Sequence, residues 1–396
     1  MTNLMQTLKD IANIVMGQSP AGETCNRDGE GLPLLNGSID FGPTHPYPTQ
    51  FTTAPKKKSK IGDLLFCVRG STGGMNWADQ EYAIGRGIAA IRHLENTRLQ
   101  PLIRAAIDIH LPSLLQSATG SVFSNVSRPQ LGSVPFPALS EREAEAVSAT
   151  LGALDDKIEL NRRMNDTLEA IARAIFKDWF VDFGPTRAKA EGRPPYLAPE
   201  VWDLFPDAFD DKGKPEGWDV CRLEDFIGLA YGKSLPAKKR KPGHVAVYGS
   251  GGIAGTHDAA LVEGPVIIVG RKGSVGSLYW EDGPAFPIDT VFYVVPRIGS
   301  MLFSYHLLAS QPLRGMNTDA AVPDLNRSNA YRLEFPMPPS KLISTFNDVA
   351  KLLWKRRAAN LKETKTIAPT RDLLLPKLIS GEIRLRHAET IAGEAL

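Results

Sequence analysis

The stretch GDLLFCVRGSTGGMNW, residues 62–77, reveals the architecture of the chain because residues 264–280, GPVIIVGRKGSVGSLYW, repeat its pattern. Each copy has a glycine, an apolar run typical of a strand, an arginine, a Gly-Ser turn and a final tryptophan. Residues 82–92 also resemble 285–297, and residues 121–140 resemble 320–340. All three pairs are separated by about 200 residues, and repetition at a fixed spacing is the signature of a duplicated structural unit. The sequence therefore predicts two globules of the same fold.

A helical pattern follows each copy. From Ser140 onward, apolar side chains recur three or four positions apart, and Glu143 completes a capping box with Ser140. The pattern returns from Ser340, where we expect Pro369 and Pro376 to kink or shorten the end of the helix. A helix of about 40 residues with a narrow apolar stripe requires a partner helix. The residues expected to face that partner are Leu151, Leu154, Ile158, Leu168, Ile175, Phe346, Val349, Leu353 and Asn360.

The two expected helices carry opposite charge. Residues 140–180 hold 6 Lys or Arg against 9 Asp or Glu, a net charge of −3, whereas residues 340–380 hold 9 against 3, a net charge of +6. Opposite charge beside an apolar seam favours pairing of unlike helices over self-association. The fold class that follows is mixed α/β (α+β), with two repeated globules joined by two long helices in an antiparallel coiled coil. The alternative is that each helix packs separately on its own globule.

The order of these patterns predicts the division of the chain. The segments are a first globule at 1–139, a first helix at 140–183, a linker at 184–217, a second globule at 218–338, a second helix at 339–385 and a tail at 386–396. The linker is assigned because it is rich in proline, glycine and charge and has no periodic apolar pattern.

The composition argues against a membrane or secreted protein. No run of about 18 apolar residues is present, and the N-terminal segment, which is acidic as well as basic, is unlike a secretory signal. Cys25, Cys67 and Cys221 lie far apart and outside any metal-binding spacing. We therefore expect reduced thiols in a cytoplasmic protein without a structural metal.

Basic side chains point to nucleic acid. The runs PKKKSK at 55–60 and AKKRK at 237–241 place one dense cluster in each globule, and the repeated Gly-Ser turns add further cations. Lys, Arg and hydroxyl groups bind phosphate oxygens, and Arg can also form two hydrogen bonds with guanine. The residues expected to contact DNA are Lys56, Lys57, Lys58, Lys60, Arg69, Ser71, Thr72, Arg86, Lys238, Lys239, Arg240, Lys241, Arg271, Lys272, Ser274 and Arg327.

Motifs of catalysis are missing from the sequence. Residues 270–276 lack the spacing of a nucleotide-binding P-loop. RPPY at 193–196 resembles the [ND]PP[YF] motif of amino-methyltransferases, but Arg193 replaces the amide or carboxylate that accepts the amine proton. The seven histidines are dispersed without metal-binding spacing. We therefore expect that this chain catalyses no reaction.

Taken together, the motifs resemble the specificity subunits of type I restriction-modification systems, over nearly the whole chain. GEGLPLLNGSIDFG at 29–42, the two Gly-Ser turn segments and residues 82–92 carry the resemblance in the globules. The helical segment 154–183 and LLLPKLISGEIRL at 373–385 carry it in the helices. The resemblance implies two target-recognition domains, each reading one half of a split, asymmetric site in double-stranded DNA. The two helices would set the distance between the halves.

The resemblance also implies partners and a non-catalytic role. Two modification subunits, which use S-adenosylmethionine to methylate adenine, would dock on the helices, and two restriction subunits that use ATP and Mg would join them. This chain itself would bind no cofactor.

Two other interpretations stay open at this point. A coiled-coil scaffold whose globules bind proteins would bind its partner tightly and independently of salt. A methyltransferase would bind S-adenosylmethionine as the isolated chain. The sequence does not give the bases recognised, the spacer length or the presence of a restriction subunit.

Overall fold

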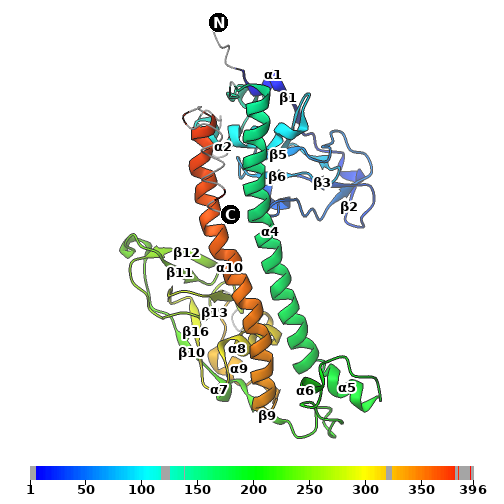
Figure 1. Cartoon of the computed structure of the whole chain (residues 1–396), viewed down its shortest axis with the longest axis vertical. Helices are drawn as coiled ribbons and strands as arrows, with labels where there is room; N and C mark the ends of the chain where they lie inside the picture. Colours follow the sequence, from blue (N-terminus) through cyan, green and yellow to red (C-terminus); the bar gives the residue numbers. More distant parts are fainter. Residues whose placement is uncertain are drawn as a thin grey trace. The chain divides into compact units, whose positions relative to one another are not determined.

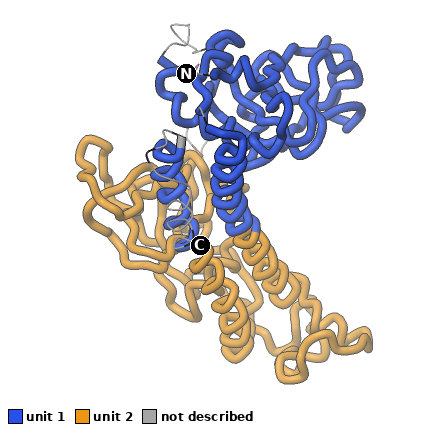
Figure 2. Tube along the Cα trace, turned by 45° about the horizontal axis from the view of Figure 1, so that its top comes forward, with its two compact units in different colours: residues 1–163, 361–396 blue, residues 164–360 orange. Residues whose placement is uncertain are grey.

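Each half of the chain folds around a four-stranded antiparallel sheet. The computed structural model describes residues 6–116, 125–137, 139–317 and 323–379, together with the isolated positions 382 and 393, and Figure 1 labels its elements. Two units result (Figure 2): unit 1 contains Met1–Arg163 and Leu361–Leu396, and unit 2 contains Met164–Asn360. The division falls inside both long helices, so each unit contains one globule and part of each helix.

Unit 1 contains two sheets. The first has the strand order β1-β8-β5-β6 and is antiparallel throughout, and the second has the order β2-β4-β3-β7, in which β3 and β7 are parallel. The strands are β1 (Ala12–Met16), β2 (Cys25–Asn26), β3 (Leu32–Leu35), β4 (Phe51–Thr52), β5 (Leu64–Cys67), β6 (Met75–Trp77), β7 (Ala83–Ile84) and β8 (Ile88–His93). The helices of this globule are α1 (Leu8–Ile11), α2 (Gln100–Gln116) and α3 (Arg128–Gly132).

Unit 2 repeats this plan, with sheets ordered β10-β16-β13-β14 and β12-β11-β15 and a pair β17-β9. The strands are β9 (Asp219–Arg222), β10 (Ile227–Tyr231), β11 (Val245–Gly249), β12 (Gly252–His257), β13 (Val266–Gly270), β14 (Leu278–Glu281), β15 (Ala285–Pro287), β16 (Val291–Pro296) and β17 (Glu334–Met337). The helices of this globule are α7 (Leu223–Phe226), α8 (Met301–Ser310) and α9 (Arg327–Tyr331). In both four-stranded sheets, the first strand in the chain pairs with the last, the last pairs with the second, and the second pairs with the third. This shared topology confirms the predicted repeat.

Strand β5 and its counterpart β13 are buried on both faces. In β5, Leu64 and Phe66 pack into the core that includes α2, whereas Leu65 and Cys67 pack into a second core between the two sheets. This separation follows from the alternation of side chains along a strand. It explains why the repeated apolar runs of the sequence are continuous rather than alternating.

The long helices α4 (Glu141–Phe180) and α10 (Ser340–Ile379) have 40 residues each. In unit 1, Asn161 Nδ2 donates to Glu363 Oε2 at 2.8 Å, and in unit 2, Asn360 Nδ2 donates to Asn165 Oδ1 at 2.9 Å. Later positions of α4 meet earlier positions of α10, so the helices pair in antiparallel fashion, as predicted.

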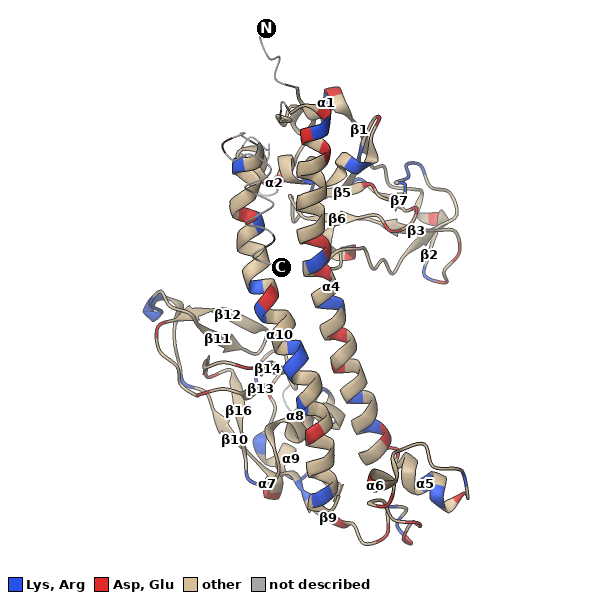
Figure 3. Cartoon of the chain, in the orientation of Figure 1, with Lys and Arg blue, Asp and Glu red and all other residues tan. Residues whose placement is uncertain are grey.

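Ion pairs join the two helices within each unit, and Figure 3 marks the charged residues along both of them. In unit 1, Arg371 Nη1 of α10 lies 2.6 Å from Asp155 Oδ1 of α4. In unit 2, Arg357 Nε of α10 lies 2.6 Å from Glu169 Oε1 of α4. Acidic α4 and basic α10 are therefore matched in both units.

Pro369 and Pro376 lie inside α10 without ending it, so the expectation that they shorten the helix was wrong. Both prolines are exposed, whereas Ile367, Leu374 and Leu378 beside them are buried in the core of unit 1. Packing of this apolar face offsets the backbone hydrogen bonds that the prolines remove. Of the predicted second helix at 339–385, the part beyond residue 379 lies outside the described residues apart from position 382, and so does the predicted tail at 386–396 apart from Gly393.

The predicted linker is an ordered part of unit 2. It contains α5 (Gly184–Ala190) and α6 (Pro199–Trp202), and the ring of Phe205 packs edge-on against Trp179 at 5.5 Å. The segment therefore contributes to the apolar core at the end of α4. Among the described residues, no helix is both long and apolar enough to cross a bilayer.

Candidate nucleic-acid interface

One edge of the globule in unit 1 gathers the ends of several strands. The backbone N–H of Val68, after β5, donates to the carbonyl of Gly87 at 2.8 Å, and that of Gly85 donates to the carbonyl of Leu35, the last residue of β3, at 2.7 Å. The N–H of Val126, just before α3, donates to the carbonyl of Val68 at 3.1 Å. The turns after β3, β5 and β7 and the N-terminus of α3 therefore meet here. We call this the strand-end edge of unit 1.

Glycines allow the backbones at this edge to approach closely. A Cβ atom on Gly87 would lie 2.2 Å from the carbonyl oxygen of Asn36, and one on Gly17 would lie 2.1 Å from that of Gly85. These distances are far below van der Waals contact. Gly87, in the sequence IGRGIAA, is thus required by packing, and the loops that follow are held rigidly against one another.

Unit 2 has the same edge. The N–H of Arg271 donates to the carbonyl of Thr290 at 3.0 Å, and the N–H of Leu325 donates to the carbonyl of Arg271 at 2.8 Å. These hydrogen bonds make Arg271 the structural equivalent of Val68. The arginine at position 69 then corresponds to Lys272. The comparison of the two sequences pairs Arg69 with Arg271 instead. The structure therefore shifts this match by one residue.

Half of the predicted DNA-contacting residues lie at these edges. They are Arg69, Ser71, Thr72 and Arg86 in unit 1, and Arg271, Lys272, Ser274 and Arg327 in unit 2. Most are exposed, but Thr72, Arg271 and Arg327 are half-buried. The Nε of Arg86 donates to Ser19 Oγ at 3.2 Å.

The lysine run of unit 1 extends from this edge along β7. Lys58 pairs with Ala83 as a β-bridge, and the carbonyl of Lys57 accepts from Ile84 N–H at 3.0 Å. The side chains of Lys56, Lys57, Lys58 and Lys60 are all exposed.

The basic run of unit 2 lies on a different strand. Lys241 N–H donates to His257 Nδ1 at 3.1 Å and the guanidinium of Arg240 donates to the carbonyl of Ala254, which places the run beside β12. The position equivalent to Lys58 is Val262, because Val262 pairs with Ala285 of β15. Lys238, Lys239 and Lys241 are exposed and Arg240 is half-buried. Each globule therefore carries one basic run, and the two runs occupy different positions in the repeated fold.

Two arginines of unit 2 gather over one tyrosine. The guanidinium carbons of Arg327 and Arg271 lie 4.7 and 5.3 Å from the ring centroid of Tyr231, which is 49% exposed. Arg271 Nη2 donates to the carbonyl of Asp289 at 2.7 Å. This cluster, Tyr231, Arg271 and Arg327, is named the arginine–tyrosine cluster.

Sequence reasoning missed two residues at the edges. Arg128, exposed at the start of α3, is the equivalent of Arg327 at the start of α9. The similarity between residues 121–140 and 320–340 contains that match. Tyr231 had no comparable signal, because its partners come from distant strands and from α9.

The hairpin β5–β6 of unit 1 and the hairpin β13–β14 of unit 2 each contact a long helix at the end opposite to their turn. In unit 1, Thr44 donates to Glu159 of α4, and His45 Nδ1 lies 2.9 Å from the carbonyl of Trp77 at the end of β6. A hydrogen bond from Arg162 is the main cause that lowers the pKa of Glu159. In unit 2, Arg357 of α10 lies 3.1 Å from Asp282, just after β14. Each strand-end edge is thus fixed relative to the helix that carries it in the same unit.

The residues predicted to face the partner helix lie in or beside the cores. Leu151, Leu154, Phe346 and Asn360 are buried, and the half-buried ones are Ile158, Leu168, Ile175, Val349 and Leu353.

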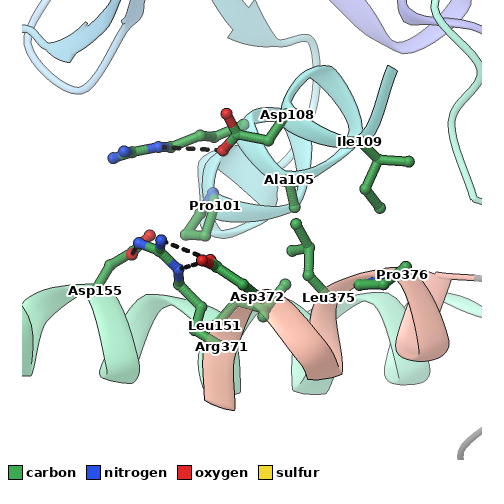
Figure 4. A pocket seen from close by; sticks show the side chains of 11 residues that line it. Pro101, Ala105, Asp108, Ile109, Leu151, Asp155, Arg371, Asp372, Leu375 and Pro376 are labelled. Atoms are coloured by element: carbon green, nitrogen blue, oxygen red, sulfur yellow. Dashed lines mark hydrogen bonds and ion pairs between the residues drawn. The ribbon is translucent and has the colours of Figure 1, made fainter. Parts of the chain in front are cut away.

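A cavity of about 470 Å³ lies between α2, α4 and α10 in unit 1 (Figure 4). Its charges are satisfied within the chain: Arg371 contacts Asp155 and Asp372 at 2.6 and 2.7 Å, and Arg104 lies 3.7 Å from Asp108. Burial raises the pKa of Asp108. The cavity is a junction of ion pairs between helices, and its described lining offers no unpaired charge to a ligand.

The described residues contain no group of three or more His, Cys, Asp or Glu arranged to hold a metal ion. Cys25, Cys67 and Cys221 are free thiols, and Cys67 is buried in β5.

Comparison with known proteins places both repeats in one family. The family model described as "Type I restriction modification DNA specificity domain" matches residues 4–170 and 215–342. The HindI specificity subunit of a type I restriction enzyme from Haemophilus influenzae is 24% identical over 408 residues, covering 83% of this chain and 88% of that protein.

Two further proteins are similar. The putative type I restriction enzyme MjaX specificity subunit of Methanocaldococcus jannaschii is 32% identical over 162 residues, which cover 41% of this chain and only 38% of that protein. The crystal structure of a type I restriction-modification S subunit from M. genitalium matches with a TM-score of 0.55 at 18% identity, over 95% of each chain. The latter is a likeness of fold.

Proposed function

The chain belongs to the type I restriction modification DNA specificity family, and on that basis we propose that it selects a split, asymmetric DNA target for a type I restriction-modification complex. One observation carries the proposal: the two units present the same strand-end edge with different side chains. In the same hydrogen-bond register, Arg69 of unit 1 corresponds to Lys272 of unit 2 and Arg86 corresponds to Asp289, and all four side chains are exposed. Readers of one fold with unlike contact residues select unlike half-sites, since base edges are read by side chains.

The long helices provide the spacer in this proposal. A helix of 40 residues is about 60 Å long, which exceeds the 34–36 Å or so of one turn of DNA. Two readers on such helices contact successive major grooves, and the bases between them go unread.

Outward apolar side chains on the helices suit docking of modification subunits. Leu160 and Ile171 of α4 are 51% and 43% exposed, and Leu352 and Leu373 of α10 are 71% and 54% exposed. We infer that two modification subunits dock on these helices, that restriction subunits join the complex in the cytoplasm, and that this chain is not itself a catalyst. S-adenosylmethionine, ATP and Mg would then be bound by the partners.

The direct test is a methylation map. The chain would be co-expressed with the modification subunit of its own system in a host that lacks DNA methylation, and modified adenines would be located by sequencing. We expect two short specified halves around a fixed gap. Absence of modified adenines, from a complex that assembles with the modification subunit, would refute the proposal.

Loss of a lysine beside the strand-end edge is expected to weaken binding to all DNA sequences alike. Replacing Lys57 by glutamine removes one phosphate contact, so the slope of log K against log[salt] becomes smaller by about 0.9. Fluorescence anisotropy between 50 and 200 mM salt, roughly the range in which such slopes are read, measures the effect.

Lys212 provides the matched control, since it is exposed in the segment between α6 and β9. Lys212→Gln changes the net charge equally and should leave the slope unaltered. Equal slopes for the Lys57→Gln variant and the wild type would remove the lysine run from the interface.

A further inference from the structure

The arginine–tyrosine cluster holds two cations in fixed positions without an acidic partner in the described part of the chain. The side chain of Arg271 is anchored by the carbonyl of Asp289, and its Nε is buried without a hydrogen-bond partner among the described residues. The Nη1 of Arg327 makes a long contact of 3.4 Å with the carbonyl of Leu229. The ion pairs of the described residues include neither arginine. Two like charges beside one ring, without an acidic partner among the described residues, are suited to binding a group that accepts hydrogen bonds.

The two arginines differ in what they can offer. Arg271 has its Nε inside the cluster and one terminal nitrogen committed to a carbonyl. Arg327, at the first position of α9, has Nε and Nη2 without a partner within the described chain. These two nitrogens form one edge of a planar fork, which matches a pair of acceptors. The guanidinium carbon of Arg327 lies 4.7 Å from the centroid of the Tyr231 ring, and this cation–π contact restrains the position of the fork.

The described residues of unit 1 form no such cluster. The position equivalent to Tyr231 is Met16, because these residues end the paired strands β10 and β1. The equivalent of Arg271 is Val68, and only Arg128 matches its counterpart, Arg327. Arg128 is exposed and has no aromatic ring against it in the described part of unit 1. The cluster therefore distinguishes one half of the duplicated structure from the other.

A fixed guanidinium suits a base, whereas a mobile cation is sufficient for a phosphate. Phosphates are contacted along the whole backbone by flexible side chains, but reading guanine requires two donors aimed at O6 and N7 in one plane. Resting on the proposed function, we propose that Arg327 reads a guanine in the half-site of unit 2. Tyr231 and Arg271 act as positioning residues for it.

The proposal can be tested with 7-deazaguanine, which lacks the N7 acceptor but still pairs with cytosine. The probes are duplexes that carry the methylated motif, with one guanine on either strand replaced in each. The complex of this chain with its modification subunits is expected to lose about 10-fold in affinity at one guanine. The Arg327→Ala variant, which has no donor for O6 or N7, should bind the unmodified motif about 10-fold more weakly and lose nothing further at that guanine.

The equivalent substitution in unit 1 is the matched control. Arg128→Ala should keep the full sensitivity to 7-deazaguanine at that position. Tyr231→Met and Arg271→Val, which introduce the residues of unit 1, should each reduce the sensitivity without abolishing binding. A circular-dichroism spectrum and a thermal unfolding midpoint equal to those of the wild type show that a variant is folded.

The outcomes separate this inference from the proposed function. A wild-type complex that binds its motif with no loss at any substituted guanine would overturn the inference alone, and so would full sensitivity in Arg327→Ala. A wild-type complex that binds no motif at all would overturn the proposed function.

Discussion

Replacing Phe346 by alanine is expected to lower the free energy of unfolding by about 3–5 kcal/mol, as for other large aromatic residues of protein cores. Phe346 of α10 is fully buried. Its ring lies 5.4 Å from Phe176 and 5.6 Å from Phe180, both of α4, and 6.1 Å from Phe303 of α8. Truncation leaves a cavity where both long helices and the globule of unit 2 meet. Urea denaturation followed by tryptophan fluorescence measures the loss.

Leu352 provides the control on the same helix. Because its side chain is 71% exposed, Leu352→Ala should change the free energy of unfolding by less than about 0.5 kcal/mol. A loss below about 1 kcal/mol for Phe346→Ala would mean that this aromatic cluster does not hold the end of the helix pair.

Acid is expected to destabilise unit 2 through a buried histidine. His306 is 3% exposed among Phe176, Phe346 and Trp354. Burial, with a smaller contribution from the charge of Arg173, lowers the pKa of His306 to about 4 from its usual 6.5. The unfolded chain therefore takes up a proton at a pH where the folded chain does not.

The direction in which pH changes the free energy of unfolding follows from this difference in pKa. The contribution of His306 is fully present above pH 6.5 and is lost as the pH falls toward 4, by roughly 3 kcal/mol in all and about 2 kcal/mol between pH 7 and pH 5. We expect His306→Phe to remove that part of the difference between unfolding free energies measured at pH 7 and pH 5. His244→Gln, at an exposed position, should leave the difference unchanged. An identical pH dependence in His306→Phe and the wild type would contradict the assignment.

The parts of the fold that depend on local pattern could be predicted from the sequence. The capping box is an example: Ser140 Oγ donates to Glu143 Oε2 at 2.6 Å, at the start of α4. The two helical stretches were predicted for the same reason, since their signals lie within short windows, and their pairing was predicted from the opposite net charges of the two windows. Alternation, capping and charge act between near neighbours in the chain.

The parts of the fold that depend on hydrogen-bond register or packing between distant segments could not be predicted from the sequence. The correspondence of Arg271 with Val68 is fixed by hydrogen bonds to Thr290 and Gly87 in other segments. The continuation of α10 through Pro369 depends on the core that its neighbour Ile367 enters. Neither partner is visible in the window around the residue concerned.

The candidate site, like the fold, could be predicted from the sequence only in part. The cations at the turns were found because arginine and lysine are visible as residue types. The arrangement of Arg327 over Tyr231 could not be found in this way, because the two residues belong to α9 and β10 and meet only once the sheet of unit 2 has formed.

The two basic runs have a consequence for comparison of the two halves of the chain. A segment inherited from a common ancestral half would occupy the same strand in both copies, as the turns after β5 and β13 do. Lys58 instead pairs with β7, whereas Arg240 lies beside β12. The turns after β5 and β13 are therefore equivalent positions of the repeat, and the two lysine runs are not. Similarity of residue type between the halves thus marks equivalent positions at the turns but not in the lysine runs.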